Sequence, residues 1–153
     1  MKLSNSLVGI VYSIAGFGSL IAVTFLSTFL NKKDAFILMN ISMATIPLVI
    51  MVSGIVENWI FFGICYSILS GLITIASVSI TTIQQQESTV YNIGKILSSS
   101  FVIATIFAPF GGILAAYFNW LLNPRLSLVI LGLLSSLLVI LIKSYEKKIK
   151  GDK

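Results

Sequence analysis

Residues 7–34 read LVGIVYSIAGFGSLIAVTFLSTFLNKKD, an uncharged apolar stretch that ends in a basic turn. At about 1.5 Å per residue, a helix over 7–30 covers about 36 Å, which exceeds a hydrocarbon core of about 30 Å. A cleavable signal peptide is the competing interpretation, because Lys2 precedes the stretch. The apolar region of a signal peptide has only about 7–15 residues, so we interpret 7–30 as a retained membrane span.

Four further apolar stretches predict membrane spans over 35–56, 59–83, 96–118 and 126–142. The last is close to the lower limit of about 17 residues for a spanning helix. Three of the turns between the spans are short, and 84–95 is a longer polar loop; spans joined by the short turns must be antiparallel neighbours. The sequence therefore predicts an all-α, polytopic membrane bundle of five transmembrane helices. This single bundle occupies 7–145, and a basic cytoplasmic tail follows over 146–153.

The basic residues predict the orientation of these helices. Eight of the ten lie at 32–33, at 95 and within 143–153, whereas the other segments hold only Lys2 and Arg125. Lysine and arginine are retained in cytoplasmic loops. We therefore expect the N-terminus outside and the C-terminus in the cytoplasm.

The composition indicates a membrane protein. The chain is 57% hydrophobic and 10% charged, with a mean hydropathy of +1.03, whereas soluble domains carry about 25% charged residues. We therefore expect the lipid bilayer to be a binding partner in which the chain is embedded. The net charge of +5 does not indicate nucleic-acid binding, because the basic residues lie in turns and in the tail. The excess of lysine over arginine, with much isoleucine, serine and asparagine, favours a bacterial, multi-pass protein of the plasma membrane.

Several kinds of chemistry lack the residues they need. The chain contains no histidine, and Cys65, the one cysteine, lies within an apolar stretch. No aspartate, glutamate, lysine, arginine or histidine occurs in the middle of a span, so any ion coupling must come from another polypeptide. We find no nucleophile–base pair, phosphate-binding glycine loop or metal-ligand cluster. We therefore predict no enzymatic activity, catalytic residue, cofactor or metal.

Small residues form rows on two predicted helices. In the third span, Gly63, Ser67 and Gly71 recur every fourth position. A longer row in the fourth span has the same spacing and consists of Ser100, Ala104, Ala108, Gly112 and Ala116. Small side chains let another membrane helix approach closely. We therefore predict that the row in the fourth span is a helix-packing surface.

Hydroxyl-bearing side chains on the third span admit two interpretations. They bond to neighbouring helices or to carbonyl groups of their own helix, or they form the weakly polar wall of a cavity for an amphipathic substrate. Our candidate cavity residues are the polar side chains Tyr12, Tyr66, Ser70, Thr74 and Ser77. Each is also compatible with a packing role.

Three segments carry a family resemblance, namely the glycine-rich first span with its basic turn 31–34, the polar segment 84–95 and the segment 108–112. Together they resemble the major facilitator superfamily of permeases, of the bacterial drug or macrolide efflux type. The glycine-rich span ending in the basic turn 31–34 resembles helix eight and the loop that follows it. The segment 84–95 is similar to the loop between helices ten and eleven. The segment 108–112, Ala-Pro-Phe-Gly-Gly, resembles part of helix eleven. The turn 31–34 departs from the family pattern, because it lacks the glycine of the usual basic loop.

The resemblance implies that the five spans correspond to helices eight to twelve of a twelve-helix permease. The implied activity is export of an amphipathic small molecule by alternating access of two helical halves. The first seven helices have no counterpart here, so we expect a partial or truncated transporter that is inactive alone. Its partner is then the missing N-terminal half. The alternative is a stand-alone immunity, assembly or regulatory factor that contacts another membrane protein.

Overall fold

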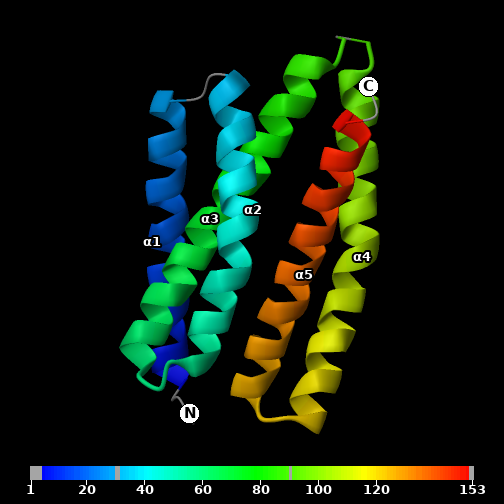
Figure 1. The fold of residues 1–153 in the computed structure, drawn as a ribbon. Coiled ribbons are helices and arrows are strands. Elements are labelled where there is room, and N and C mark those ends of the chain that lie inside the picture. Colours follow the sequence, from blue (N-terminus) through cyan, green and yellow to red (C-terminus); the bar gives the residue numbers. More distant parts are fainter. Residues whose placement is uncertain (1–4, 30–31, 90, 152–153) are drawn as a thin grey trace.

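The computed structural model describes residues 5–29, 32–89 and 91–151 (Figure 1). Its helices are α1 (Asn5–Phe29), α2 (Lys32–Ile55), α3 (Trp59–Glu87), α4 (Ile93–Leu121) and α5 (Pro124–Gly151). Each contains a segment long and apolar enough to cross a membrane. The predicted all-α fold with five helices of spanning length is confirmed. Residues 30–31, at the first predicted turn, and 152–153, in the predicted tail, lie outside the described residues.

The helices extend beyond the spans that hydropathy predicts. Helix α3 continues through Gln84, Gln85 and Gln86, which we had placed in a polar loop, and only 88–92 separate it from α4. Glutamine and glutamate have high helix propensity, so the helix continues after the apolar pattern has ended. Helix α5 likewise continues into the lysine-rich tail as far as Gly151. Hydropathy marks the apolar part of a helix rather than its ends.

Local capping explains the two turns that lie at the same end of the bundle. The side chain of Asn58 accepts a hydrogen bond of 3.0 Å from the backbone N–H of Ile60, which fixes the start of α3. Helix α5 begins at Pro124, whose missing N–H costs nothing in the first turn. The hydroxyl of Ser127 donates to the carbonyl of Phe118 at 2.9 Å, which also accepts from the backbone N–H of Leu122, so it ties the start of α5 to the last turn of α4. Both turns are therefore specified locally.

Helix α3 is at the centre of the packing. It contacts α1 along one side and α2 along another, and α2 contacts α5 in turn. Helix α4 touches α3 and α5 only sparsely. Figure 1 shows α3 crossing behind α2 and diverging from α4 below the turn that joins them. The arrangement is therefore a closely packed set of α1, α2, α3 and α5 with α4 at its edge.

The α1–α3 seam depends on two glycines. A Cβ atom placed on Gly18 would overlap the backbone carbonyl oxygen of Ser67. A Cβ atom on Gly71 would lie 3.1 Å from the carbonyl oxygen of Gly18 and 3.7 Å from Cβ of Ala22. Lipid supplies no hydrophobic force between helices, so close van der Waals contact must hold them together. Glycine at both positions permits that contact.

The α2–α5 seam also depends on two glycines. A Cβ atom on Gly54 would lie 2.8 Å from the carbonyl oxygen of Arg125 and 2.9 Å from Cγ2 of Val129. One on Gly132 would lie 3.0 Å from the carbonyl oxygen of Pro47 and would overlap the side chain of Met51. This seam therefore also relies on backbone approaching backbone.

Helix α4 lacks such a seam. None of its residues is buried, and no atom of another element lies within 4 Å of a Cβ atom placed on Gly111 or Gly112. Its apolar side chains include Phe101, Phe107 and Ile113, which are 74%, 65% and 65% exposed. Within the described residues, the chain thus leaves nearly the whole surface of one helix uncovered.

The orientation of the bundle across the membrane remains a prediction, which reporter fusions can test. A reporter active only in the cytosol should give signal when fused after Lys153 and when inserted after Asn31, because both sites lie at lysine-bearing ends. The same reporter inserted after Asn58 is the matched control and should stay silent. Signal after Asn58 together with silence after Lys153 would reverse the predicted orientation.

Candidate functional site

The predicted cavity residues come from two helices that meet. Tyr12 lies on α1, and Tyr66, Ser70, Thr74 and Ser77 lie on α3. The rings of Tyr12 and Tyr66 pack edge to face, with centroids 5.8 Å apart and planes at 87°. Ser70 donates a hydrogen bond of 3.4 Å to the hydroxyl oxygen of Ser19. The α1–α3 seam therefore has one side that carries aromatic and hydroxyl groups.

Helical spacing extends this side along α3. Tyr66, Ser70, Ser77 and Gln84 fall on one face of the helix, with Thr74 at its edge, and we call these five residues the α3 stripe. At the C-terminal end of the stripe, Gln84 Nε2 donates a hydrogen bond of 2.8 Å to Ser100 Oγ of α4. The stripe thus begins beside α1 and ends against the first residue of the small row on α4.

The hydroxyl groups of the stripe differ in what they bond. Thr74 Oγ1 donates to the carbonyl oxygen of Ser70 at 2.9 Å, so its hydrogen is used within its own helix. Ser77 is exposed, and its carbonyl oxygen accepts from Thr81 at 2.9 Å. Thr74 thus fits the interpretation of bonding within the helix, whereas Ser70 bonds to another helix. The cavity role of all five candidates remains a prediction.

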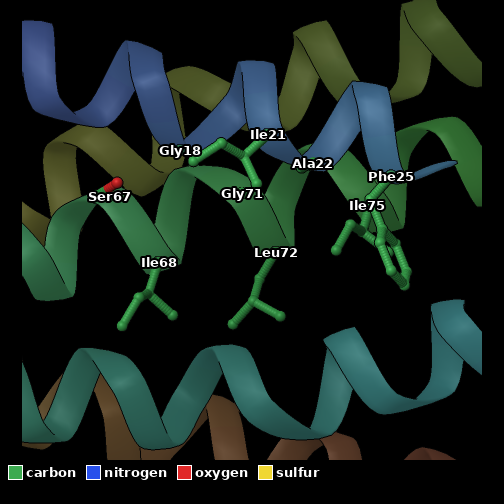
Figure 2. A pocket seen from close by; sticks show the side chains of 9 residues that line it. All are labelled: Gly18, Ile21, Ala22, Phe25, Ser67, Ile68, Gly71, Leu72 and Ile75. Carbon is green, nitrogen blue, oxygen red and sulfur yellow. The ribbon is translucent and has the colours of Figure 1, made fainter.

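A separate groove lies on the other side of the α1–α3 seam. It encloses about 340 Å³ and is lined by side chains from α1 and α3, including Ile21, Phe25, Ile68 and Leu72 (Figure 2). Ser67 supplies the one hydroxyl of its lining, and none of the five candidate cavity residues contributes. Sequence reasoning did not identify this groove. The isoleucines at 21, 68 and 75 resemble any lipid-facing residues, so no sequence signal distinguishes them.

The structure places the predicted packing row of α4 on an open surface. Ser100 is partly buried by its contact with Gln84, whereas Ala104, Ala108, Gly112 and Ala116 are exposed. A shallow cavity of about 360 Å³ includes Ala116 and residues at the start of α5. The row is therefore accessible to another helix, and its packing role remains a prediction.

One ion pair joins the turns at the outer end, as defined by the predicted orientation. Arg125 Nη1 lies 2.6 Å from Glu57 Oε1, and the two side chains are 46% and 80% exposed. Water screens such pairs, so their contribution to stability is small. The pair links the α2–α3 turn to the start of α5, beside the close contact at Gly54.

We expect Glu57→Gln to lower the free energy of unfolding by no more than about 1 kcal/mol, because the pair is largely solvated. The effect should shrink in about 1 M salt, where the Debye length is near 3 Å. A double-mutant cycle with Arg125→Gln, measured by unfolding in mixed micelles, isolates the pair. A coupling energy of several kcal/mol would contradict this expectation.

The site offers aromatic rings and hydroxyl groups rather than reactive groups. The charged side chains Asp34, Glu57, Lys95 and Lys143 lie at or near the ends of the apolar segments. Among the described residues, no cluster of three or more histidine, cysteine, aspartate or glutamate side chains is placed to hold a metal ion. The arrangement suits reversible binding of an amphipathic molecule or another helix. No protein-family model, curated protein or solved structure matches this chain.

Proposed function

We propose that the five helices are helices eight to twelve of a secondary transporter of the major facilitator type. It exports an amphipathic small molecule by alternating access, and it requires helices that are not among these 153 residues. The observation that carries the proposal is the bare surface of α4, none of whose residues is buried. An uncovered surface of this kind is expected where further helices of the transporter pack against α4.

The order of helix contacts supports this assignment. Each six-helix half of these transporters contains two three-helix repeats in inverted orientation. On this assignment, α1 and α2 are the last two helices of one repeat, and α3, α4 and α5 form the next. The contact of α1 with α3 then has an inverted counterpart, between α4 and the helix that precedes α1 in the repeat. That helix is not among the described residues, which accounts for the uncovered face of α4.

The α3 stripe supports a role as part of a cavity wall. Its hydroxyl and amide groups lie on a membrane-spanning helix, where a polar group facing lipid alone is unfavourable. The side chains of Tyr66 and Ser70 contact α1, and Gln84 contacts α4, whereas Ser77 is exposed between them. A weakly polar cavity would solvate this face. An uncharged cavity wall suits an amphipathic substrate.

A chimaera tests the proposal. Residues 7–145 replace helices eight to twelve of a characterised exporter of this family, and efflux of a fluorescent amphipathic dye is measured in cells. We expect efflux from the chimaera and none from the 153-residue chain alone. Efflux from the isolated chain would overturn the need for further helices. A chimaera that reaches the membrane and exports nothing would count against the assignment.

Cysteine cross-linking in the same chimaera separates misfolding from a wrong assignment. A cysteine at Gly112 should form a disulfide with one introduced on helix seven, because that helix is proposed to cover the row on α4. A cysteine at Ile106, on the opposite face of α4, is the matched control and should not react with it. Equal reaction at both positions would show that helix seven does not lie along the row.

The alternative function is a stand-alone factor that acts through helix contact, and the exposed row on α4 is the observation that favours it. Ala108→Phe places a phenyl ring within the row, whereas Ile106→Phe places one on the opposite face. Affinity capture in mild detergent should then recover a stoichiometric membrane partner with Ile106→Phe and lose it with Ala108→Phe. Equal recovery with both variants would exclude a role of the row.

A further inference from the structure

We propose that Tyr12, Phe62 and Tyr66, with the Ser19–Ser70 pair, form a subsite for the aromatic ring of an uncharged amphipathic molecule. The inference rests on the proposed function, because it names a chemical class for the substrate. It is carried by the way two helices hold three rings and two hydroxyl groups together.

Tyr66 contacts both of the other rings, whereas most of the surface of Tyr12 is exposed. Phe62 and Tyr66 are nearly parallel, at 6°, with centroids 6.3 Å apart on α3. Tyr12 reaches across from α1 and meets Tyr66 edge to face, yet it remains 63% exposed. Offset-stacked and edge-to-face contacts are the geometries that aromatic rings favour. The open surface of Tyr12 can therefore take a further ring.

The depth of these rings distinguishes them from interfacial anchors. Trp59 begins α3 and Trp120 lies in the last turn of α4, where membrane interfaces place aromatic residues. Tyr66 is seven residues beyond Trp59, or about 10 Å further into the membrane at 1.5 Å per residue. Tyr12 lies at a similar depth, because its ring meets that of Tyr66. Tyr12 and Tyr66 therefore lie within the span, whereas Phe62 is about one turn from Trp59.

The hydroxyl pair supplies a polar contact next to the rings. Ser70 is one helical turn beyond Tyr66, and its bond to Ser19 is long, at 3.4 Å. A long bond is easily exchanged for one to a ligand oxygen or nitrogen. The four residues from Tyr66 to Ser70 correspond to about 6 Å along the helix axis. The expected ligand thus carries a polar atom at a comparable distance from its aromatic ring.

The charge of the surroundings favours an uncharged ligand. The charged groups nearest in sequence to the cluster are Lys2, Lys32, Glu57 and Glu87, and none lies within the apolar stretches of α1 and α3. A cation would have only ring faces to bind, and an anion would have no cation to pair with. A neutral molecule incurs neither penalty.

Photolabelling tests the subsite without requiring transport. The full chain in lipid nanodiscs is labelled with hydroxymethyl-phenyl diazirine, which is uncharged and aromatic, or with an alkyl diazirine alcohol of equal hydrophobicity. Labelled residues are mapped by mass spectrometry. We expect the aryl probe, and not the alkyl probe, to concentrate on α1 and α3 near Tyr12 and Tyr66, with competition by excess benzyl alcohol.

Matched variants identify the residues responsible. Tyr66→Leu and Tyr12→Leu should each lower aryl labelling about threefold to tenfold, the range expected when one aromatic pair is lost. Tyr66→Phe keeps the ring and should keep the labelling. Phe17→Leu removes a 65% exposed ring from another face of α1 and should change nothing. Labelling spread evenly over the exposed helix faces, or unchanged in Tyr66→Leu, would overturn the subsite.

The outcomes separate this inference from the proposed function. Efflux by the chimaera without selective aryl labelling would refute the subsite and leave the transporter assignment intact. Selective labelling without efflux would support the subsite and count against the assignment.

Discussion

Gly18→Ala should destabilise the bundle by about 1–3 kcal/mol, the usual effect of adding a methyl group to a packed contact. The new methyl would overlap the backbone carbonyl of Ser67, which no rotamer change can move away. Helices α1 and α3 must therefore separate, and the contact of Gly71 with Gly18 would be lost as well. Unfolding in mixed micelles with rising dodecyl sulfate, followed by circular dichroism, measures the difference.

Gly16→Ala is the matched control on the same helix. No atom of another element lies within 4 Å of a Cβ atom at this position. Alanine should raise the free energy of unfolding by about 0.5–1 kcal/mol, because it restricts the unfolded chain more than glycine does. The two substitutions are chemically identical and should act in opposite directions. Equal effects would mean that the α1–α3 seam is not as close as described.

Gly54→Ala should have a comparable effect on the second seam. Its methyl would lie 2.8 Å from the carbonyl oxygen of Arg125 and 2.9 Å from Cγ2 of Val129, so α5 would have to shift away from α2. We expect a loss of about 1–3 kcal/mol in the same unfolding assay. The α2–α5 contact also holds the α4–α5 hairpin to the rest of the bundle, so the hairpin should become mobile. Hydrogen exchange should rise in α5 first.

Gly112→Ala provides the contrast for this second seam. Gly112 lies in the small row of α4 and has no neighbouring atom within 4 Å of its added Cβ. In the isolated chain, the substitution should therefore be neutral or slightly stabilising. In the chimaera with helix seven, the same substitution should reduce assembly if the row is covered there. Destabilisation of the isolated chain by Gly112→Ala would show that the row already has a partner.

Hydropathy predicts the helices well and their ends poorly. The first stretch, 7–30, lies within one residue of the end of α1, because an apolar run of that length has one stable conformation in lipid. By contrast, Gln84–Glu87 belongs to α3 although it is polar, because backbone hydrogen bonding continues after the side chains leave the hydrocarbon. Helical spacing alone puts Tyr66, Ser70 and Ser77 on one face of α3. It did not reveal that Tyr12 and Ser19 lie opposite them.

The sequence by itself determined five helices of membrane length, because long uncharged stretches must satisfy their backbone groups internally when no water is present. It also showed two rows of small residues, one with Gly63, Ser67 and Gly71 and one with Ala104, Ala108 and Gly112. Only the tertiary structure decided that α1 covers the first row and that the second is open. The reason is physical: lipid is as apolar as the side chains, so the fit of one backbone against another selects the neighbours, and that fit depends on the arrangement of all the helices.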